Sequence, residues 1–330
     1  MFNLVTGASG FTGGHLVQAM LRDGEQVRAL VRRGGAATEL AQAGAEIFEG
    51  ELTDRDAVLQ AAKGCDRIFH IAAVFRTAGH PDQYYFDVNV GGTRNVIEAA
   101  RHWGCERLVH CSTGGVHGHV ANPPADENYR FQPDDVYQRS KLEGEQAVQA
   151  AGRAGQPVCI VRPGAIYGEG DLRFLKLFRS IQRRRFVMIG TGRTRLHMVH
   201  VEDLVDGIRL CGASPAALGE VFLLAGPEAP TLNEIVATTA GILKIPPPRW
   251  HVPVWPVYTA GLLCEMACVP LGIDPPLHRR RVGFFTHNRE FNIDKARQRL
   301  GYAPRIDVRT GIERTMRWYA ANGYMDAIPA

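Results

Sequence analysis

The stretch VTGASGFTGGHL, residues 5–16, decides the fold, because it joins an apolar strand pattern to a helical pattern through spaced glycines. Gly7, Gly10 and Gly13 lie three residues apart within it. Glycines allow a tight turn and a close approach of the backbone to a ligand, and the free N–H groups at a helix N-terminus attract a pyrophosphate. The stretch therefore predicts a dinucleotide-binding turn between a strand and a helix.

Alternating strand and helix patterns continue from this turn to about residue 170. Apolar runs predict strands at residues 2–7, 26–32, 45–50, 67–73, 107–113 and 158–164. The alternation predicts an α/β fold of the Rossmann type, with a doubly wound parallel sheet. We expect the dinucleotide-binding domain to span residues 1–170, with returns at about 196–227 and 284–297. A smaller, discontinuous substrate-binding part with a lid takes residues 171–195, 228–283 and 298–330.

The composition of the chain narrows the class of protein. With 45 % hydrophobic and 22 % charged residues, its 330 residues are expected to fold around a substantial core. A net charge of only +4 argues against a nucleic-acid partner. His110, His117 and His119 cluster near one strand, but a metal site needs convergent ligands, so we predict hydrogen-bonding roles for them and no metal. The first residues do not resemble a signal peptide, which favours a cytoplasmic location.

One stretch near the end of the chain is rich in proline and apolar residues. Between Val252 and Ile273 it contains Pro253, Pro256 and Pro270, with Glu265 as a charge. Prolines and a charge argue against a membrane-spanning helix. We expect a lid over an apolar pocket, and the alternative is a peripheral contact with a membrane surface.

A tyrosine and a lysine stand at helical spacing in DVYQRSKLEGE, residues 135–145. Tyr137 and Lys141 occupy positions i and i+4, which share one face of a helix. An ammonium group beside a phenol lowers the pKa of the phenol from its ordinary value of about 10, so that it becomes an acid or base near neutrality. The alternative is two solvated side chains on an ordinary helix. We predict that Tyr137 exchanges a proton with a substrate oxygen.

The end of the second predicted strand bears on the choice of cofactor. An NAD enzyme places a carboxylate there for the ribose hydroxyls, but this chain has Val31 followed by Arg32 and Arg33. Guanidinium groups pair with a 2′-phosphate, which a carboxylate would repel. The sequence therefore predicts a preference for NADP, with NAD as the other possibility. The alternative interpretation is two exposed arginines in an arginine-rich chain.

The glycine spacing G-x-x-G-x-x-G, together with Tyr137 and Lys141, resembles the extended short-chain dehydrogenase/reductase family, within the NAD(P)-dependent epimerase/dehydratase superfamily. The resemblance covers almost the whole chain and includes HIAAVFR, DVNVGGTRNV, RPGAIYGEGD and HMVHVEDLVDG. It implies that Lys141 also hydrogen-bonds the nicotinamide ribose. It places the catalytic hydroxyl at Thr113, with Ser112 as the alternative. It also implies that Asn89 orders water and backbone around the proton relay formed by Tyr137 and Lys141. An equally good interpretation is that Asn89 is an ordinary polar residue of a helix.

The same resemblance suggests which residues surround the cofactor. Arg32 matches an arginine of the dihydroflavonol-reductase branch, and Glu51 stands where the family holds an acid near the adenine amino group. The complete expected set is Gly7, Ser9, Gly10, Phe11, Thr12, Gly13, Arg32, Arg33, Glu51, Leu52, Ala72, Ala73, Tyr137, Lys141, Pro163 and Ile166.

Departures from subfamily patterns restrict the reaction. Gly114 and Gly115 stand where nucleotide-sugar dehydratases carry an Asp-Glu pair, and Ala165 stands where sugar epimerases usually carry Asn. Leu196 and His197 stand where those epimerases tend to carry an Arg-Asp pair for the diphosphate. The C-terminal part, from PPLHRRRVGFF onwards, resembles the 3β-hydroxysteroid and sterol-carboxylate dehydrogenase branch.

The apolar side chains after residue 170 suggest what the substrate is. If Phe174, Leu175, Phe178 and residues 250–273 line the cleft, they suit a flat hydrophobic ketone or alcohol, and the alternative is that they are plain core. We predict an NADP-preferring oxidoreductase acting on a steroid-, flavonoid- or polyketide-like secondary alcohol or ketone. The alternatives are a nucleotide-sugar 4-epimerase with tightly bound NAD and a non-catalytic NADP-sensing protein. Relatives further imply a homodimer joined through helices at about 82–103 and 135–152.

Overall fold

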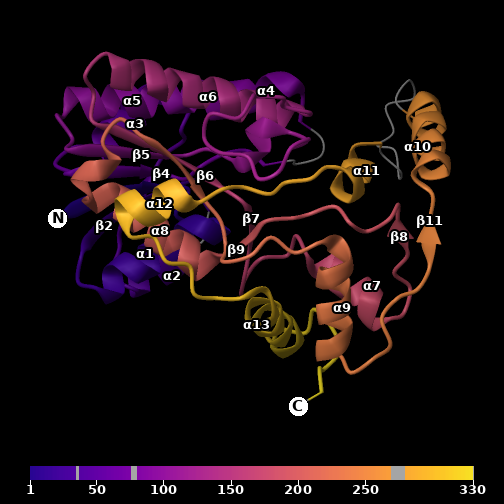
Figure 1. Cartoon of the computed structure of the whole chain (residues 1–330). Coiled ribbons are helices and arrows are strands. Elements are labelled where there is room, and N and C mark those ends of the chain that lie inside the picture. Colours follow the sequence, from indigo (N-terminus) through magenta and orange to yellow (C-terminus); the bar gives the residue numbers. More distant parts are fainter. Residues whose placement is uncertain (35–36, 76–79, 269–278, 330) are drawn as a thin grey trace.

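The computed structural model describes residues 1–34, 37–75, 80–268 and 279–329, and it shows an α/β fold built on one large sheet (Figure 1). Seven parallel strands lie in the order β10-β6-β5-β4-β1-β2-β3. Their bounds are β1 Phe2–Thr6, β2 Gln26–Val31, β3 Glu46–Glu49, β4 Arg67–His70, β5 Arg107–Cys111, β6 Val158–Pro163 and β10 Val221–Leu224. The six predicted strands and the doubly wound parallel sheet are therefore confirmed.

The sheet has its topological switch point between β1 and β4. From β1 the chain proceeds to β2 and β3 on one side, and it then crosses to β4 and continues outward to β10 on the other side. Val5 of β1 lies between Ala29 of β2 and Phe69 of β4. In such sheets the crevice outside the carboxyl ends of the strands, at this point of reversal, is where ligands bind.

Alternate strand residues enter two separate cores, one on each face of the sheet. Leu4 and Ile68 pack with helices α3, α5 and α6, while their neighbours Val5 and Phe69 pack with α1 and α8. This alternation follows from the two-residue period of a strand, and it leaves both faces apolar, as parallel sheets require. The covering helices are α1 Phe11–Arg22, α3 Arg55–Ala61, α5 Gly92–His102, α6 Val136–Arg153 and α8 Val201–Ala213, with shorter helices α2 Ala37–Gln42, α4 Asp82–Phe86 and α12 Asp294–Leu300 (Figure 1).

A third apolar core lies beyond the carboxyl end of the sheet. Phe178, Ile235 and Ile312 are fully buried there, and they belong to helices α7 Leu175–Gln182, α9 Leu232–Ile242 and α13 Val308–Ala321. Small parallel strand pairs connect this region to the sheet, namely β7 Ala165–Tyr167 with β9 Met198–His200, and β8 Met188–Ile189 with β11 His251–Val252. Segments far apart in the chain thus build one wall of the crevice.

The proline-rich stretch forms a helix at the edge of the molecule. Its described part contains α10 Val254–Cys268, which extends away from the sheet near α11 Arg279–Thr286 (Figure 1). The remainder of the stretch, residues 269–273, lies outside the described residues. Within the described ranges, no helix is both long enough and apolar enough to pass through a bilayer.

Candidate active site

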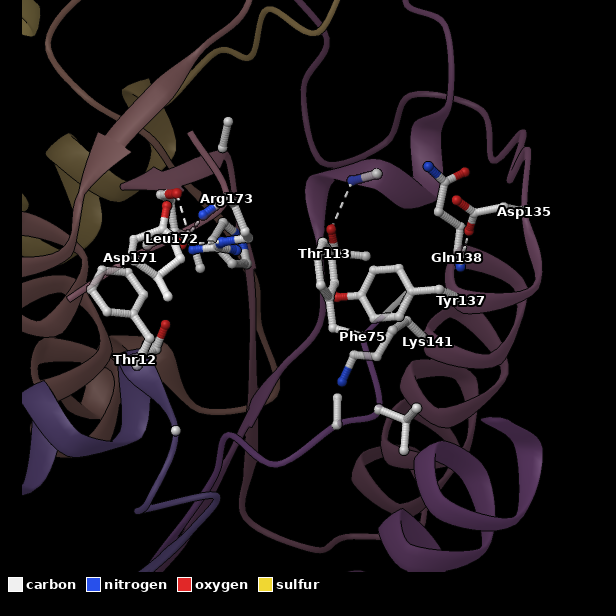
Figure 2. A pocket seen from close by; sticks show the side chains of 18 of the residues that line it. Thr12, Phe75, Thr113, Asp135, Tyr137, Gln138, Lys141, Asp171, Leu172 and Arg173 are labelled. Atoms are coloured by element: carbon white, nitrogen blue, oxygen red, sulfur yellow. Dashed lines mark hydrogen bonds and ion pairs between the residues drawn. The ribbon is translucent and has the colours of Figure 1, made fainter. Parts of the chain in front are cut away.

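A deep cleft opens at the switch point of the sheet and has a volume of about 1980 Å³. Its floor is made by the ends of β1, β4, β5 and β6, and it continues outward to α11 and α10. Side chains enter it from both walls: Thr12, Asp171, Leu172 and Arg173 from one, and Thr113, Tyr137 and Lys141 from the other (Figure 2).

The glycine turn forms one end of the cleft and has no room for side chains. Gly7 has a φ of +72°, and a Cβ added there would lie 2.7 Å from the backbone N and Cα of Ala72. A Cβ added at Gly13 would lie 2.1 Å from the carbonyl oxygen of Gly7. Helix α1 begins after Gly10, which has no side chain to cap its first N–H groups. These residues fit the pyrophosphate of a dinucleotide, because N–H groups without a capping side chain bind anions.

The two arginines after β2 are placed differently. Arg32 lines the cleft, together with Glu51 and Leu52 after β3. The side chain of Arg33 is 94 % exposed and lies 3.8 Å from the Glu49 carboxylate, on the outside of the protein. A ligand phosphate in the cleft would therefore meet Arg32 and not Arg33.

Most of the other expected cofactor residues also reach the cleft. The lining residues among the expected set are Gly7, Ser9, Gly10, Phe11, Thr12, Gly13, Arg32, Glu51, Leu52, Ala72, Ala73, Tyr137, Lys141, Pro163 and Ile166, with Ser112 and Thr113 beside them. Arg33 and Asn89 do not line it. Segments from β1, β2, β3, β4 and β6 thus converge because all of their strands end at the same edge.

Helix α6 positions Tyr137 and Lys141. Its N-cap is Asp135, whose side chain accepts a hydrogen bond from the backbone N–H of Gln138 at 2.8 Å. The cap starts the helix directly before Tyr137, so that this residue and Lys141 stand on successive turns and point into the cleft (Figure 2). Lys141 is 1 % exposed, and burial lowers the pKa of its ammonium group from the ordinary value. Lys141 is therefore held inside the protein, and the partly buried Tyr137 stands above it at the cleft.

The two candidate hydroxyls after β5 have different partners. Ser112 Oγ donates a hydrogen bond to the buried Glu145 carboxylate at 2.5 Å, and Glu145 also forms an ion pair with Arg162. Thr113 Oγ1 accepts a hydrogen bond from the backbone N–H of Gly115 at 3.0 Å. Because this bond uses an oxygen lone pair, the hydroxyl proton of Thr113 stays available for an acceptor in the cleft.

Asn89 lies behind the cleft wall, in the π-helical turn Asp87–Gly91. Its Oδ1 accepts from the backbone N–H of Val74 at 2.7 Å, and its Nδ2 donates to the Val74 carbonyl and to Ser140 Oγ. The side chain is 1 % exposed. Asn89 thus joins the segment after β4 to helix α6, which carries Tyr137 and Lys141.

Two buried histidines lie behind the cleft lining, near Lys141, and the sequence analysis did not single out the first of them. His70 is hydrogen-bonded to Thr6 Oγ1 at 2.8 Å and Thr93 Oγ1 at 2.9 Å, and burial lowers its pKa to about 3. His110 stands 5.2 Å from it between ring centroids, and among the described residues neither of its ring nitrogens has a hydrogen-bond partner. Burial also lowers the pKa of His110, so both imidazoles are neutral.

The other two histidines near this strand face different partners. His117 contacts the Arg130 carbonyl and the Arg162 guanidinium, and the backbone N–H of Asn288 donates to His119. A separate group, formed by Glu169, His200 and Glu202, has its ligand atoms within 4.8 Å of one another. Arg314 donates hydrogen bonds to both of these glutamates, which supplies the positive charge that the two carboxylates require.

The sequence analysis missed an arginine that reaches across the cleft. Arg173 Nε donates to Asp171 Oδ1 at 2.6 Å, and its guanidinium carbon lies 5.5 Å from the ring centre of Phe11 and 5.6 Å from that of Phe75. The Phe75 ring in turn stands edge-on to Tyr137, with centroids 4.9 Å apart. Asp171 ends the quoted motif RPGAIYGEGD, but no local pattern distinguished Arg173 from the chain's other arginines.

The outer part of the cleft is apolar with some cationic groups. Phe174 lines it, as expected, whereas Phe178 is fully buried in the third core and Leu175 packs against that core. The interpretation as plain core therefore holds for those two residues. The other apolar lining residues are Leu172, Leu177, Phe186, Val187, Leu196, Val254, Tyr258, Val282, Phe284, Phe285 and Phe291, and the cationic ones are Arg173, Lys176, Arg185 and Arg289.

The packing around Gly114 explains one departure from the dehydratase pattern. A Cβ at Gly114 would lie 2.7 Å from Cζ of Phe291 and 3.0 Å from the carbonyl oxygen of Pro163. An acidic side chain therefore has no space at this position unless the Phe291 ring moves.

The parallel sheet, the glycine cradle and the Tyr–Lys pair together define a dinucleotide-binding protein of the α/β class. The family described as the NAD dependent epimerase/dehydratase family matches residues 3–225, and the chain belongs to it. A 4-hydroxy-2-methyl-3-oxo-4-farnesyl-3,4-dihydroquinoline-1-oxide ketoreductase of Stigmatella aurantiaca is 32 % identical, over 95 % of both chains. A 3 beta-hydroxysteroid dehydrogenase/Delta 5→4-isomerase of Mycobacterium tuberculosis is 29 % identical, over 96 % of this chain and 90 % of its own. The crystal structure of gox2253 is 29 % identical and superposes with a TM-score of 0.85 over 98 % of this chain and 99 % of its own.

Proposed function

We propose that the protein is an NADP-preferring oxidoreductase that interconverts a hydrophobic secondary alcohol and its ketone. The observation that carries this proposal is the convergence of Tyr137, Lys141 and the Thr113 hydroxyl on one cleft that begins at the glycine cradle. A nicotinamide bound there accepts or supplies the hydride. Membership of a family named for its NAD dependence supports the same class of reaction.

Each residue of the relay has a distinct role in this proposal. Tyr137 gives its phenolic proton to the carbonyl oxygen during reduction and takes it back during oxidation. Thr113 donates its hydroxyl proton to the same oxygen and stabilises the charge that develops there. Lys141 places an ammonium group beside the phenol and holds the cofactor ribose. Asn89 and Ser112 act through other residues, since their side chains bond Val74, Ser140 and Glu145.

The preference for NADP rests on Arg32. Its side chain lines the end of the cleft after β2, and no acidic side chain follows that strand directly. A guanidinium group pairs with a 2′-phosphate through charge-assisted hydrogen bonds. Glu51, one strand further along, lies in the same part of the cleft and is the residue we assign to the adenine amino group.

The substrate class rests on the outer walls of the cleft. Phe174, Phe284 and Phe285 stand there with other apolar side chains, which suit a flat hydrophobic molecule. The two relatives described above are named for a farnesylated quinoline oxide and for a 3β-hydroxysteroid, which are large and mainly apolar. We therefore assign a steroid-, flavonoid- or polyketide-like alcohol or ketone.

Two further observations support our proposals for the cellular location and the oligomeric state. All seven cysteines lie in the described ranges as free thiols, which is typical of a reducing compartment, and we assign the protein to the cytoplasm. Helices α5 and α6 pack against each other on one face of the sheet (Figure 1). We assign the same two helices of a second copy as their partners in a homodimer.

The decisive experiment measures loss of NADPH and NADH absorbance with a panel of steroid, flavonoid, polyketide and sugar-nucleotide ketones. We expect turnover of an apolar ketone with NADPH favoured over NADH. Purified protein that retains NAD tightly and turns over sugar nucleotides without net redox change would instead show an epimerase. Full residual activity in Tyr137→Phe would show that the cleft binds a nucleotide without catalysing through this residue.

A further inference from the structure

One side of helix α10 faces the cleft, and the opposite side is apolar and exposed to solvent. Val254, Tyr258 and Glu265 lie on one side of the helix and line the cleft. Trp255, Leu263 and Met266 lie on the other side and are 71 %, 66 % and 64 % exposed. A helix that is apolar on all sides is expected inside a protein or in contact with lipid, yet this one stands at the edge of the molecule (Figure 1).

The exposed apolar side chains of the described residues concentrate around this helix. Six of the twelve large ones lie in β8, β11, α10 or directly beside them: Trp250, Trp255, Leu263 and Met266, together with Val187 and Tyr258, which are partly exposed at the rim of the cleft that they also line. We call this group the apolar edge. Its members are contiguous because β8 pairs with β11, and the backbone N–H of Met188 donates to the Trp250 carbonyl at 2.9 Å. A contiguous patch of this kind marks an interaction site on a protein surface.

The charges beside the apolar edge identify its partner. Arg183 and Arg184 are exposed where the chain leaves α7 and enters β8, and Arg249 is exposed directly before Trp250. Between residues 249 and 268 the only acidic residue is Glu265, which lines the cleft on the other side of the helix. One further acid, Asp326, is attached to this region, since its backbone bonds Gln182 at the end of α7. The patch therefore combines apolar side chains with a local excess of positive charge.

We propose that the apolar edge docks on the surface of an anionic lipid bilayer, with α10 lying in the plane of the interface. Trp250, Trp255, Leu263 and Met266 enter the boundary between headgroups and acyl chains, and Arg183, Arg184 and Arg249 contact the lipid phosphates. The fifteen residues of α10 rise about 22 Å, which is shorter than the hydrocarbon core of about 30 Å, so the helix lies on the membrane and does not cross it.

The arrangement favours a bilayer over a second copy of the chain. In a two-fold symmetric contact through this patch, the arginines of one copy would approach those of the other, and like charges across an interface oppose association. A bilayer with anionic headgroups complements the arginines and the apolar side chains together.

The position of α10 also links the membrane to the cleft. The inner side of the same helix forms the outer wall of the cleft, so an apolar substrate dissolved in the bilayer would enter directly beside α10. This second part rests on the proposed function, whereas the docking of the apolar edge does not.

The test is co-sedimentation of the purified full-length protein with vesicles of phosphatidylcholine alone and of phosphatidylcholine mixed with phosphatidylglycerol, without substrate or cofactor. We expect binding to the mixed vesicles to be at least about tenfold tighter and to weaken at high salt. Tryptophan fluorescence should shift to the blue on binding, because Trp250 and Trp255 leave water. Equal binding to both kinds of vesicle, or no binding to the mixed ones, would overturn the proposal.

Variants separate the two parts of the patch. The double variant Leu263→Ser/Met266→Ser should bind mixed vesicles at least about tenfold more weakly, and Arg183→Glu/Arg249→Glu should remove the preference for anionic lipid. Leu218→Ser is the matched control, since Leu218 is 53 % exposed but lies away from α10, and it should bind as the parent does. Unchanged binding of both double variants, or loss of a dimer in Leu263→Ser/Met266→Ser seen by light scattering, would contradict a lipid partner. The variant Leu263→Ser/Met266→Ser should reduce a water-soluble ketone as fast as the parent protein does. If the parent protein reduced none of the ketones, the proposed function would be refuted, whereas the proposed membrane docking would be unaffected.

Discussion

The hydroxyl of Ser112 donates a hydrogen bond to the carboxylate of Glu145, which is fully buried and paired with Arg162. The hydroxyl oxygen of the neighbouring Thr113 instead accepts a hydrogen bond from the backbone N–H of Gly115. Two adjacent hydroxyls thus have different tasks. Ser112 completes a buried ion-pair network, and Thr113 can donate into the cleft.

Substitution of these two hydroxyls should therefore have opposite consequences. Thr113→Val should lower kcat by about 10²- to 10³-fold with little change in thermal stability, because it removes a donor to the developing oxyanion. Ser112→Ala should keep most of the activity and lower the free energy of unfolding by about 1–3 kcal/mol, because Glu145 loses a buried partner. Ketone reduction and urea unfolding of both variants provide the check. The reverse pattern would place the catalytic hydroxyl at Ser112.

Removal of the phenolic hydroxyl tests the proton relay directly. Tyr137→Phe should lower kcat by about 10²- to 10⁴-fold and leave the affinity for NADPH nearly unchanged, since the ring still packs on Phe75. Lys141→Met should lower kcat and also weaken NADPH binding, because this residue is proposed to hold the ribose. Steady-state kinetics and fluorescence titration of NADPH measure both quantities. If Lys141→Met affected only binding, its influence on the phenol would be disproved.

The cofactor preference should depend on one arginine of the adjacent pair. Arg32→Ala should raise the KM for NADPH by about 10- to 100-fold and leave that for NADH almost unchanged, because a charged hydrogen bond contributes about 1.5–3 kcal/mol. Arg33→Ala is the control, as its side chain pairs with Glu49 outside the cleft. Val31→Asp/Arg32→Ala should reverse the preference towards NADH. An equal rise of the KM for NADPH in both single variants would show that Arg32 is not the residue that discriminates the phosphate by itself.

The glycine cradle offers a paired comparison within one helix. Gly13→Ala should abolish dinucleotide binding and destabilise the protein, since its Cβ would lie 2.1 Å from the carbonyl oxygen of Gly7. Gly14→Ala should be tolerated, because its Cβ meets nothing closer than the Ala8 carbonyl oxygen at 3.4 Å. Calorimetric titration with NADPH and thermal melting measure the two effects. Normal binding by Gly13→Ala would mean that the turn has another conformation in solution.

The buried histidines predict a loss of stability in mild acid. Burial lowers the pKa of His70 from 6.5 to about 3, so below pH 6.5 the unfolded chain binds a proton that the folded protein excludes. The contribution of such a histidine to the free energy of unfolding is therefore complete above pH 6.5. As the pH decreases, the free energy of unfolding falls by up to about 1.4 kcal/mol per pH unit for each such histidine, until the pH reaches the pKa of that histidine in the folded protein. Burial lowers the pKa of His110 in the same direction, so His110→Leu should make the slope shallower.

Urea unfolding at pH values of about 7, 6 and 5 measures this slope. His102→Leu, at an exposed position, is the control and should keep the slope of the parent protein. A slope that His110→Leu leaves unchanged would show that this histidine is protonated in the folded state or that other groups dominate.

Local patterns were sufficient to predict the sheet, the glycine turn and the Tyr–Lys pair. Each of the six strands lies within its predicted range. The signals that predict a strand, a run of apolar residues and the glycines of the following turn, lie within a few residues of one another. Tyr137 and Lys141 share a helix face for the same local reason. The order of strands follows from the chirality of βαβ units, which all sequences of this kind obey.

Long-range contacts decided what local patterns left open. Arg32 and Arg33 are equivalent in sequence, but only Arg32 lines the cleft, whereas the side chain of Arg33 is exposed beside Glu49. Phe174 and Phe178 belong to one amphipathic pattern and both pack in the third core, yet only Phe174 also lines the cleft. The position of Arg173 in the cleft involves contacts of its guanidinium group with the rings of Phe11 and Phe75, which are distant from it in the chain.

The sequence alone therefore determined the class of fold, the glycine turn and the helical spacing that pairs Tyr137 with Lys141, since these depend on neighbouring residues. Only the tertiary structure decided which hydroxyl is bound to Glu145 and which arginine lines the cleft, and only it left one side of α10 exposed. The physical reason is that a side chain's partners across the fold are set by how distant elements pack, and no pattern within one element records that packing.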